Sequence, residues 1–392
     1  MERIGIYGGT FNPPHVGHIC AAKCAVEGLE LRKLLLIPAC IAPHKVLPSN
    51  SPTPQQRCRM LQIAAGEKME VCDMELQRNG VSFTYETVEQ LRQQYPQQEL
   101  ILFMGTDMFL SFLTWREPRR ILNCVSIGVF YRGEPGELEA IEEKKAELEA
   151  MGATVYLVKN PVTAISSTQL RRMLVFHCAS PFLPDGVERY IRENGLYGTA
   201  EAYRNLPMEQ LEQVVVSLLK PNRVAHVLGC RDTAAELARR WGCDETDAAR
   251  GGILHDITKA LDGPLQLTLC REYGIVLSEF SKKNPKTLHA LTGSLVADRI
   301  FGENKQVVEA IRSHTTGKAA MTTLEKILYV ADYMEPNRDF PGVERLRALA
   351  FEDLDKALKL GLTMTIELLK EQKREISPES AEALAFLQQA GV

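Results

Sequence analysis

Apolar and polar positions follow two different rhythms in the two halves of the chain. In the first half, short apolar runs alternate with stretches in which apolar residues recur at helical spacing. This alternation is typical of βαβ units and predicts a parallel sheet. The predicted strands are Arg3–Tyr7, Leu34–Pro38, Leu100–Met104, Ser126–Tyr131 and Thr154–Leu157, and the predicted helices between them are Gly17–Gly28, Pro54–Gly66, Thr84–Tyr95 and Glu137–Met151.

In the second half strand patterns nearly vanish, and from Glu209 onward the segments have helical character. This pattern predicts an all-α domain. We place the first domain at residues 1–198, a linker at 199–207 and the second domain at 208–392. The predicted helices of the second domain are Met208–Leu219, Asp232–Trp241, Asp244–Leu261, Lys286–Phe301, Lys305–His314, Thr322–Met334 and Phe351–Lys370.

Composition agrees with two domains and narrows the class of protein. A chain of 392 residues is too long for one ordinary core. The net charge of -4 gives no basis for a general nucleic-acid binder or a basic membrane surface. The first residues lack a signal-peptide pattern, no apolar stretch approaches a membrane span, and the ten cysteines form no Cys-x-x-Cys pair. We therefore expect a cytoplasmic protein with reduced thiols and no nucleic-acid or membrane partner; an oligomer is possible.

The segment GGTFNPPHVGH follows the first predicted strand and carries candidate chemistry. Gly8 and Gly9 allow the backbone to approach a ligand closely, and the two prolines suit the entry to a helix. His15 and His18 are three residues apart, so both emerge on one face of the first helical turn. There the free N–H groups favour an anion, and two imidazoles can stabilise charge during phosphoryl transfer. A glycine–proline loop with two capping histidines is the alternative without chemistry.

This segment resembles the His-x-Gly-His nucleotidyltransferase superfamily and, more specifically, the bacterial nicotinate-mononucleotide adenylyltransferases. APHK, FMGTDMF, TWRE and ISSTQLRR follow in that family's order, whereas YRG stands where the family usually has Arg-Pro-Gly. The resemblance covers about residues 1–197. It implies a Rossmann-like, doubly wound parallel sheet that binds ATP with Mg²⁺ and nicotinate mononucleotide. The implied reaction forms nicotinate adenine dinucleotide and pyrophosphate in NAD synthesis.

The resemblance also implies roles for individual residues of the first domain. His15, His18 and Arg171 would act on the reacting phosphates. The residues expected to bind the nucleotides are Gly8, Gly9, Thr10, Phe11, Lys45, Thr84, Gly105, Asp107, Trp115, Arg132, Ser167 and Thr168. Some have plainer explanations when taken alone, since ISSTQLRR is also a well-capped helix, Lys45 a solvated surface residue and Trp115 a core residue.

Four of the eight histidines lie in the helical half, together with two aspartates in recognisable contexts. Asp256 directly follows a histidine, and Asp332 lies inside an otherwise apolar helix, where a buried carboxylate needs a partner. The candidate metal ligands are His226, His255, Asp256, His289, His314 and Asp332. A lone histidine on an apolar helix is more often a core residue, but four such histidines together with two aspartates form a ligand set. Their wide spacing excludes a zinc finger, and nitrogen and oxygen donors suit iron, manganese or zinc.

The order His…His-Asp…Asp resembles the HD-superfamily metal phosphohydrolases. LHDITK, HTTG and ADYMEPNRDFPGV extend the likeness, over roughly residues 208–372, to the bacterial HD branch that hydrolyses diadenosine tetraphosphate symmetrically to two ADP. This resemblance implies an HD-type helical domain with a di-iron centre, in which Asp256 would bridge the ions. Lys259 and Arg338 are candidate phosphate contacts, and ordinary surface charges are the alternative for both. There are two alternatives. The domain could be a different HD nucleotide phosphatase or phosphodiesterase, or a regulatory domain that binds nucleotide without turnover.

Overall fold

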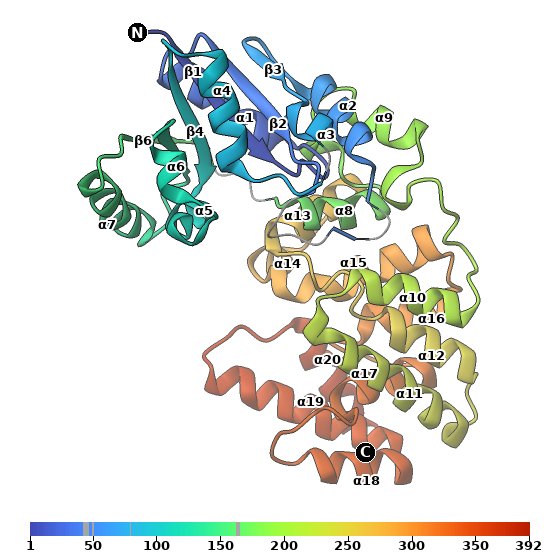
Figure 1. The fold of residues 1–392 in the computed structure, drawn as a ribbon. Helices are drawn as coiled ribbons and strands as arrows, with labels where there is room; N and C mark the ends of the chain where they lie inside the picture. Colours follow the sequence, from blue (N-terminus) through green and yellow to red (C-terminus); the bar gives the residue numbers. More distant parts are fainter. Residues whose placement is uncertain (42–46, 49–50, 79, 162–164) are drawn as a thin grey trace. The chain divides into compact units, whose positions relative to one another are not determined.

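The computed structural model describes residues 1–41, 47–48, 51–78, 80–161 and 165–392 (Figure 1). The APHK segment, and with it the predicted site residue Lys45, lies outside the described residues. Over the described residues the chain forms two compact units, Met1–Glu201 and Ala202–Val392. In this part of the chain no helix combines the length and the apolar character needed to cross a bilayer. All ten cysteines have free thiols.

The first unit is built on a six-stranded parallel sheet in the order β3-β2-β1-β4-β5-β6. This order is the doubly wound arrangement, in which the chain starts at the centre of the sheet and winds outward in both directions, so the predicted fold class is confirmed. The five predicted strands are present, whereas the three-residue edge strand β3 was missed. The strands are β1 (Arg3–Gly9), β2 (Lys33–Pro38), β3 (Met69–Val71), β4 (Glu99–Gly105), β5 (Ser126–Tyr131) and β6 (Val155–Lys159).

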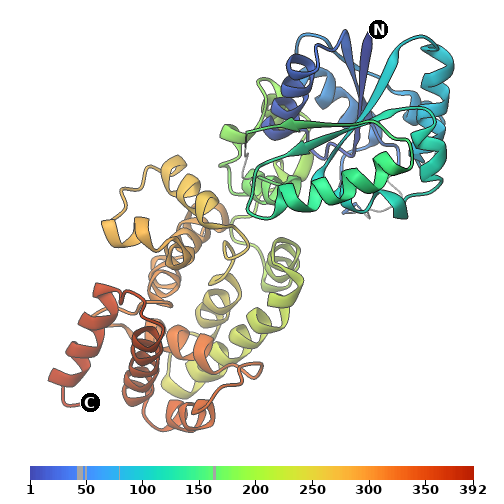
Figure 2. The same cartoon turned by 90° about the vertical axis from the view of Figure 1, so that its left-hand side faces the viewer.

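Helices cover both faces of this sheet (Figure 2). A strand covered on both faces is apolar along its whole length, and no residue from Leu100 to Met104 of β4 is more than 4% exposed. The helices of the unit are α1 (Val16–Gly28), α2 (Pro54–Ala64), α3 (Met74–Arg78), α4 (Thr84–Gln94), α5 (Thr106–Leu110), α6 (Pro118–Leu122), α7 (Glu137–Ala150), α8 (Ser167–Val175) and α9 (Val187–Glu193).

The strand order brings several predicted motifs to one edge of the sheet. β1 lies between β2 and β4, and β5 lies next to β4, so the carboxyl ends of β1, β4 and β5 are neighbours. Gly9, Gly105 and Tyr131 stand at these three ends. In doubly wound sheets a ligand binds in the crevice outside the carboxyl ends, where the strand order reverses. Here that reversal lies between β1 and β4.

The second unit is helical, and α11, α12, α16 and α17 pack against one another at its centre (Figure 1). Two predicted boundaries were wrong. α11 begins at Val224 rather than Asp232, because burial overrides the low helix propensity of the His226 and Gly229 segment. α12 ends at Leu254, and the chain then turns through the His-Asp pair. The helices are α10 (Met208–Leu218), α11 (Val224–Trp241), α12 (Glu245–Leu254), α13 (Gly263–Glu272), α14 (Glu279–Lys283), α15 (Leu288–Val296), α16 (Lys305–Ser313), α17 (Thr323–Met334), α18 (Val343–Glu352), α19 (Leu354–Glu371) and α20 (Pro378–Gln389).

Residues near the boundary between the two units pack into the second unit. The backbone N–H of Asn205 donates to the carbonyl of Phe301 (3.0 Å), and the rings of Tyr203 and Phe301 lie 6.0 Å apart. Tyr203 is buried, so these residues belong to the core of the second unit. A cut that leaves both units whole therefore falls between Glu201 and Ala202.

Candidate functional sites

The loop after β1 brings its two histidines together. His15 is the N-cap of α1 and His18 lies in its first turn, and their rings stack with centroids 3.7 Å apart. The backbone N–H of His15 donates to Nδ1 of His18 (3.2 Å), which orients the His18 ring and leaves the proton of its neutral form on Nε2. Burial, and then the charge of Arg132, lowers the pKa of His15 to about 4. The His15 ring is therefore neutral at pH 7 and offers one N–H donor.

Gly9 and Phe11 set the shape of this loop. A Cβ at Gly9 would lie 3.2 Å from the Phe11 ring, so a larger residue would displace it. Phe11 is 2% exposed, packs edge-on against His18 with centroids 5.2 Å apart, and has a φ of 45°. A left-handed φ is uncommon for a bulky residue and persists where the surroundings fix the backbone. The loop is thus held in one conformation beside the histidines.

The ISSTQLRR segment docks on the same loop through the first turns of α8. Arg171 donates to the carbonyl of Asn12 (2.9 Å) and to Oγ1 of Thr168 (3.2 Å). The hydroxyl of Ser167 donates to the carbonyl of Pro13 (3.4 Å). Two motifs from opposite ends of the first unit's sequence therefore form one site. Arg171 carries a permanent charge there, next to the start of α1.

Two further residues hold this loop, and neither was predicted as a site residue. Arg57 of α2 is 1% exposed and donates to the carbonyls of Thr10 (2.6 Å) and Ala39 (2.7 Å). It thereby joins the loops that follow β1 and β2. The hydroxyl of Tyr197 donates to Oδ1 of Asn12 (2.7 Å) in the interior. Arg57 belongs to no spaced motif, and Tyr197 ends the GVERYIRENGLY segment, but only the fold reveals what either residue contacts.

Three more of the predicted nucleotide-binding residues, Gly105, Asp107 and Arg132, follow the carboxyl ends of β4 and β5. Gly105 is the N-cap of α5, and Asp107 lies in its first turn. Arg132 follows β5, and its backbone N–H donates to Oε2 of Glu137 (2.9 Å), as does that of Gly133 (2.7 Å). Glu137 was not predicted. It fixes the loop that carries Arg132, whose charge acts on His15.

Thr84 and Trp115 are connected through their neighbours. Thr84 is the first residue of α4, and the guanidinium of Arg116 lies 4.5 Å from the ring centroid of Phe83. This contact joins the start of α4 to the segment that contains Trp115. Trp115 is half-buried and packs on Phe112 with centroids 5.5 Å apart, so part of its ring contributes to the core.

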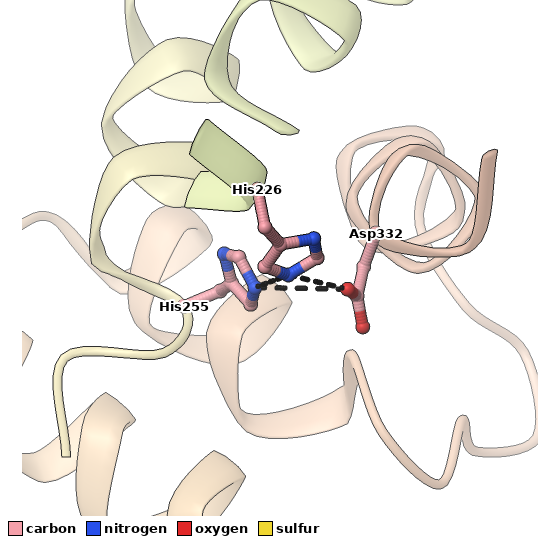
Figure 3. A group of neighbouring side chains, drawn as sticks. All are labelled: His226, His255 and Asp332. Carbon is pink, nitrogen blue, oxygen red and sulfur yellow. Dashed lines mark hydrogen bonds and ion pairs between the residues drawn. The ribbon is translucent and has the colours of Figure 1, made fainter. Parts of the chain in front are cut away.

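In the second unit the six predicted ligand residues converge. Figure 3 shows His226, His255 and Asp332 directed at one another from α11, the end of α12 and α17. Nε2 of His226 is 3.3 Å from Nε2 of His255 and 3.2 Å from Oδ1 of Asp332. These three side chains can place one ligand atom each around a single ion.

Asp256 connects this trio to the other two histidines. Its carboxylate oxygens lie 3.5 Å from Nε2 of His255, 3.5 Å from Nε2 of His289 and 3.9 Å from Nε2 of His314. His255, Asp256 and His314 form a second group whose ligand atoms all lie within 4.8 Å of one another. Asp256 is 1% exposed. The two groups share His255, and each could hold a metal ion.

Each of the four histidines has a second partner at Nδ1. For His255, His289 and His314 the partners are the carbonyls of Gly252 (2.8 Å), Lys286 (2.8 Å) and Ile311 (2.6 Å), and for His226 the partner is the carboxylate of Glu335 (3.0 Å). A carbonyl or carboxylate oxygen only accepts, so the proton sits on Nδ1 and the lone pair on Nε2 faces the cluster. Metal-binding histidines are oriented in this way.

The charges of the cluster also suit metal ions. Burial lowers the pKa of His255 and His289 well below the ordinary value and that of His314 to about 4. Burial opposes ionisation of Asp332, but the charge of Arg338, which donates to its Oδ1, helps to hold its pKa well below the usual range. Neutral imidazoles and ionised carboxylates are the forms that bind divalent ions. The donor set therefore fits a metal site.

Three cationic side chains reach the cluster. Lys259 is 2.8 Å from Nε2 of His289, and Arg338 donates to Oδ1 of Asp332 (2.6 Å), where the sequence placed them as phosphate contacts. Arg223 forms an ion pair with Asp256 and was not predicted, although it stands three residues before His226. All three can neutralise a polyphosphate.

A pocket of about 550 Å³ opens beside these residues. Lys259, His289 and Thr315 line it next to the cluster, and Phe280 and Arg374 also line it. The size is that of a small-molecule site. The pocket therefore has room for a small ligand next to the cluster.

Fold and donor geometry define a chain with a nucleotidyltransferase-type domain and an HD-type helical domain. The family models agree: a cytidylyltransferase-like model matches residues 6–173 and an HD domain model matches residues 223–337. The chain belongs to two protein families, the nicotinate-nucleotide adenylyltransferases through its first half and the symmetrical bis(5'-nucleosyl)-tetraphosphatases through its second. Both resemblances drawn from the sequence are thereby confirmed.

The relatives cover the two halves separately. The probable nicotinate-nucleotide adenylyltransferase of Desulfitobacterium hafniense is 37% identical over 199 residues, which are 50% of this chain and 96% of that protein. The symmetrical bis(5'-nucleosyl)-tetraphosphatase of Halalkalibacterium halodurans is 38% identical over 169 residues, which are 43% of this chain and 90% of that protein. A solved structure described as a "predicted HD superfamily hydrolase involved in NAD metabolism" from Clostridium acetobutylicum is 34% identical, covers 47% of this chain and 98% of its own, and has a TM-score of 0.46.

Proposed function

We propose that the chain is a bifunctional enzyme. The first unit transfers AMP from ATP to nicotinate mononucleotide, and the second hydrolyses diadenosine tetraphosphate to two ADP. One observation supports the proposal: in each unit, candidate site residues from separate segments of the chain meet in one place. His15, His18 and Arg171 meet at the start of α1, and the six metal-type donors meet inside the second unit.

In adenylyl transfer the protein itself needs no nucleophile. An oxygen of the mononucleotide phosphate attacks the α-phosphorus of ATP, a P–O bond forms, and the bond to the oxygen bridging the β-phosphate breaks to release pyrophosphate. Positioning and charge neutralisation supply the catalysis. His15 and His18 would donate hydrogen bonds to the triphosphate at the positive end of α1, and Arg171 would add a permanent charge. Mg²⁺ that arrives with ATP would neutralise the phosphates further.

The pyridine mononucleotide would bind beside Trp115 and the start of α4. Phe83, the N-cap of α4, provides no side-chain cap, so the first backbone N–H groups of the helix remain donors for an anion. The carboxylate of nicotinate is such an anion. The uncharged carboxamide of the amide mononucleotide matches these donors less well.

The first unit is tested by comparing the two mononucleotides as substrates with ATP. We expect nicotinate adenine dinucleotide as the product, with kcat/KM about 10- to 100-fold higher for the acid, since hydrogen bonds to charged groups contribute about 1.5–3 kcal/mol. The dinucleotide and pyrophosphate are quantified by chromatography. Equal specificity constants for acid and amide, or no dinucleotide from either, contradict the assignment.

The second unit would hold two divalent ions. The residues that would hold them are His226, His255 and Asp332 for one, His289 and His314 for the other, and Asp256 between the two. Such a pair activates water and stabilises charge on phosphate oxygens. The family resemblance implies iron, and the nitrogen and oxygen donors suit it.

The chain's own residues would place the tetraphosphate for cleavage. Lys259, Arg223 and Arg338 would neutralise its phosphates, and the adjacent pocket would hold one nucleotide half. Water adds to one of the two central phosphorus atoms, and the bond to the oxygen that bridges the other half breaks. Both products are then ADP.

The same chromatographic assay, run with diadenosine tetraphosphate in place of ATP, tests this reaction. ADP as the sole product supports it, whereas ATP together with AMP indicates asymmetrical cleavage. Preferred turnover of mononucleotides or cyclic dinucleotides would identify another HD phosphohydrolase. Nucleotide binding without turnover would identify a regulatory domain.

A further inference from the structure

Glu335 touches the metal-type cluster without being one of its six predicted donors. It is the C-cap of α17, 1% exposed, with Oε1 3.0 Å from Nδ1 of His226. Oε2 accepts from the backbone N–H (2.7 Å) and the side-chain amide (2.8 Å) of Asn337. The same amide donates to the carbonyl of Ala225 (3.1 Å), one residue before His226. The carboxylate and the histidine are thus fixed relative to each other.

The residues on both sides of this contact are locally unfavourable. A Cβ at Gly229 would lie 2.4 Å from Oε2 of Glu335, so only glycine leaves room for the carboxylate. Glycine inside a helix is destabilising relative to alanine. A carboxylate at the carboxyl end of a helix is also disfavoured, because that end carries partial negative charge. A functional role for the contact between Glu335 and His226 would explain both Gly229 and Glu335.

His226 differs from the other three histidines of the cluster in its Nδ1 partner. Their partners are neutral backbone carbonyls, whereas His226 faces an ionisable side chain. A carboxylate on Nδ1–H orients the ring and raises the basicity of Nε2 as a ligand. We infer that Glu335 is a positioning residue that sets the affinity of the metal position formed by His226, His255 and Asp332. This inference rests on the two-metal site of the proposed function and is independent of the nucleotide hydrolysed.

Metal binding by the full chain tests the inference without an activity assay. The chain is stripped with a chelator and titrated with Mn²⁺, with free Mn²⁺ followed by electron paramagnetic resonance. Wild type should take up two ions. Glu335→Ala should weaken one binding step by about 10- to 100-fold and leave the other unchanged. Glu335→Gln retains an uncharged acceptor for His226 and should fall between the two.

Glu325→Gln is the matched control. Glu325 is a second buried glutamate of α17, 2% exposed, and it accepts from the backbone N–H of Thr322 (2.8 Å) and pairs with Lys318 (2.7 Å). It should bind both ions as wild type does. Gly229→Ala places a methyl group against the Glu335 carboxylate and so disturbs the same contact. It should weaken the same binding step as Glu335→Ala, although alanine is the better helix former.

Wild-type affinity for both ions in Glu335→Ala would overturn the inference, as would equal weakening of both steps. If Glu335→Ala does not fold, the affinities of Glu335→Gln for the two Mn²⁺ ions decide instead. Affinities equal to those of wild type in Glu335→Gln would then contradict the inference. A chain that takes up two ions in these steps but does not cleave diadenosine tetraphosphate supports the inference and removes only the substrate assignment. A wild-type chain that takes up no Mn²⁺ overturns both.

Discussion

We expect Asp256→Asn to lose bound metal and to hydrolyse diadenosine tetraphosphate at least about 10³-fold more slowly, while dinucleotide synthesis should continue at the wild-type rate. Asp256 is the carboxylate that would lie between the two proposed metal ions, and its oxygens are 3.5 Å from the Nε2 atoms of both His255 and His289. An amide keeps the shape of the side chain but removes the negative charge that Asp256 would offer to bound metal ions. Metal-ion catalysis supplies several kcal/mol of transition-state stabilisation, and about 4 kcal/mol corresponds to 10³-fold.

Elemental analysis and the two rate assays on one preparation measure this effect. Asp247→Asn is the control, because Asp247 lies on the preceding helix α12 and accepts from Asn304 (2.8 Å) at the surface. It should keep its metal and both rates. Full metal content with full hydrolysis in Asp256→Asn would show that the cluster is not the catalytic centre.

His18→Ala should lower dinucleotide synthesis by about 10²-fold or more and leave hydrolysis intact. The ring of His18 is oriented by the His15 N–H and by stacking at 3.7 Å, so its Nε2–H donor is preorganised at the start of α1. Removing one preorganised donor to developing charge costs about 10²–10³-fold in kcat. The loss should therefore fall on kcat.

Steady-state kinetics with ATP as the varied substrate separate kcat from KM. His177→Asn is the control, since His177 is exposed and has a φ of 53° that asparagine tolerates. A thermal melt shows whether the lost contact with His15 has only destabilised the unit. Wild-type kcat in a folded His18→Ala would remove this histidine from the mechanism.

The strands of the sheet were predictable because burial on both faces gives short, continuous apolar runs. β4 is the clearest case, with every residue from Leu100 to Met104 buried. β3 gave no such run, since Met69–Val71 pairs with β2 alone at the edge of the sheet. The start of α11 was missed because its first turns contain Gly229. Glycine has a low helix propensity, and its presence here is explained by the close approach of Glu335, which the sequence does not reveal.

The site residues found from sequence are those that belong to spaced motifs. The six metal-type donors and the pair His15 and His18 can be recognised in the sequence, because histidine and aspartate are typical metal and phosphate ligands. The residues that hold them have no such signature: Arg57 binds carbonyls of two loops, and Arg223 pairs with Asp256 through space. One sequence feature could have identified Glu335 as a candidate functional residue. A glutamate followed by proline at the end of an apolar helix opposes the helix dipole and calls for a partner.

The central claim is that one chain carries two complete and separate active sites. Expressing Met1–Glu201 and Ala202–Val392 separately, and assaying each for both reactions, tests it most directly. The account predicts two folded fragments, the first active only in dinucleotide synthesis and the second only in tetraphosphate hydrolysis, each with a specific activity within a few-fold of the intact chain. A fragment that folds, by circular dichroism and thermal melting, yet remains inactive until the other fragment is added would contradict the claim.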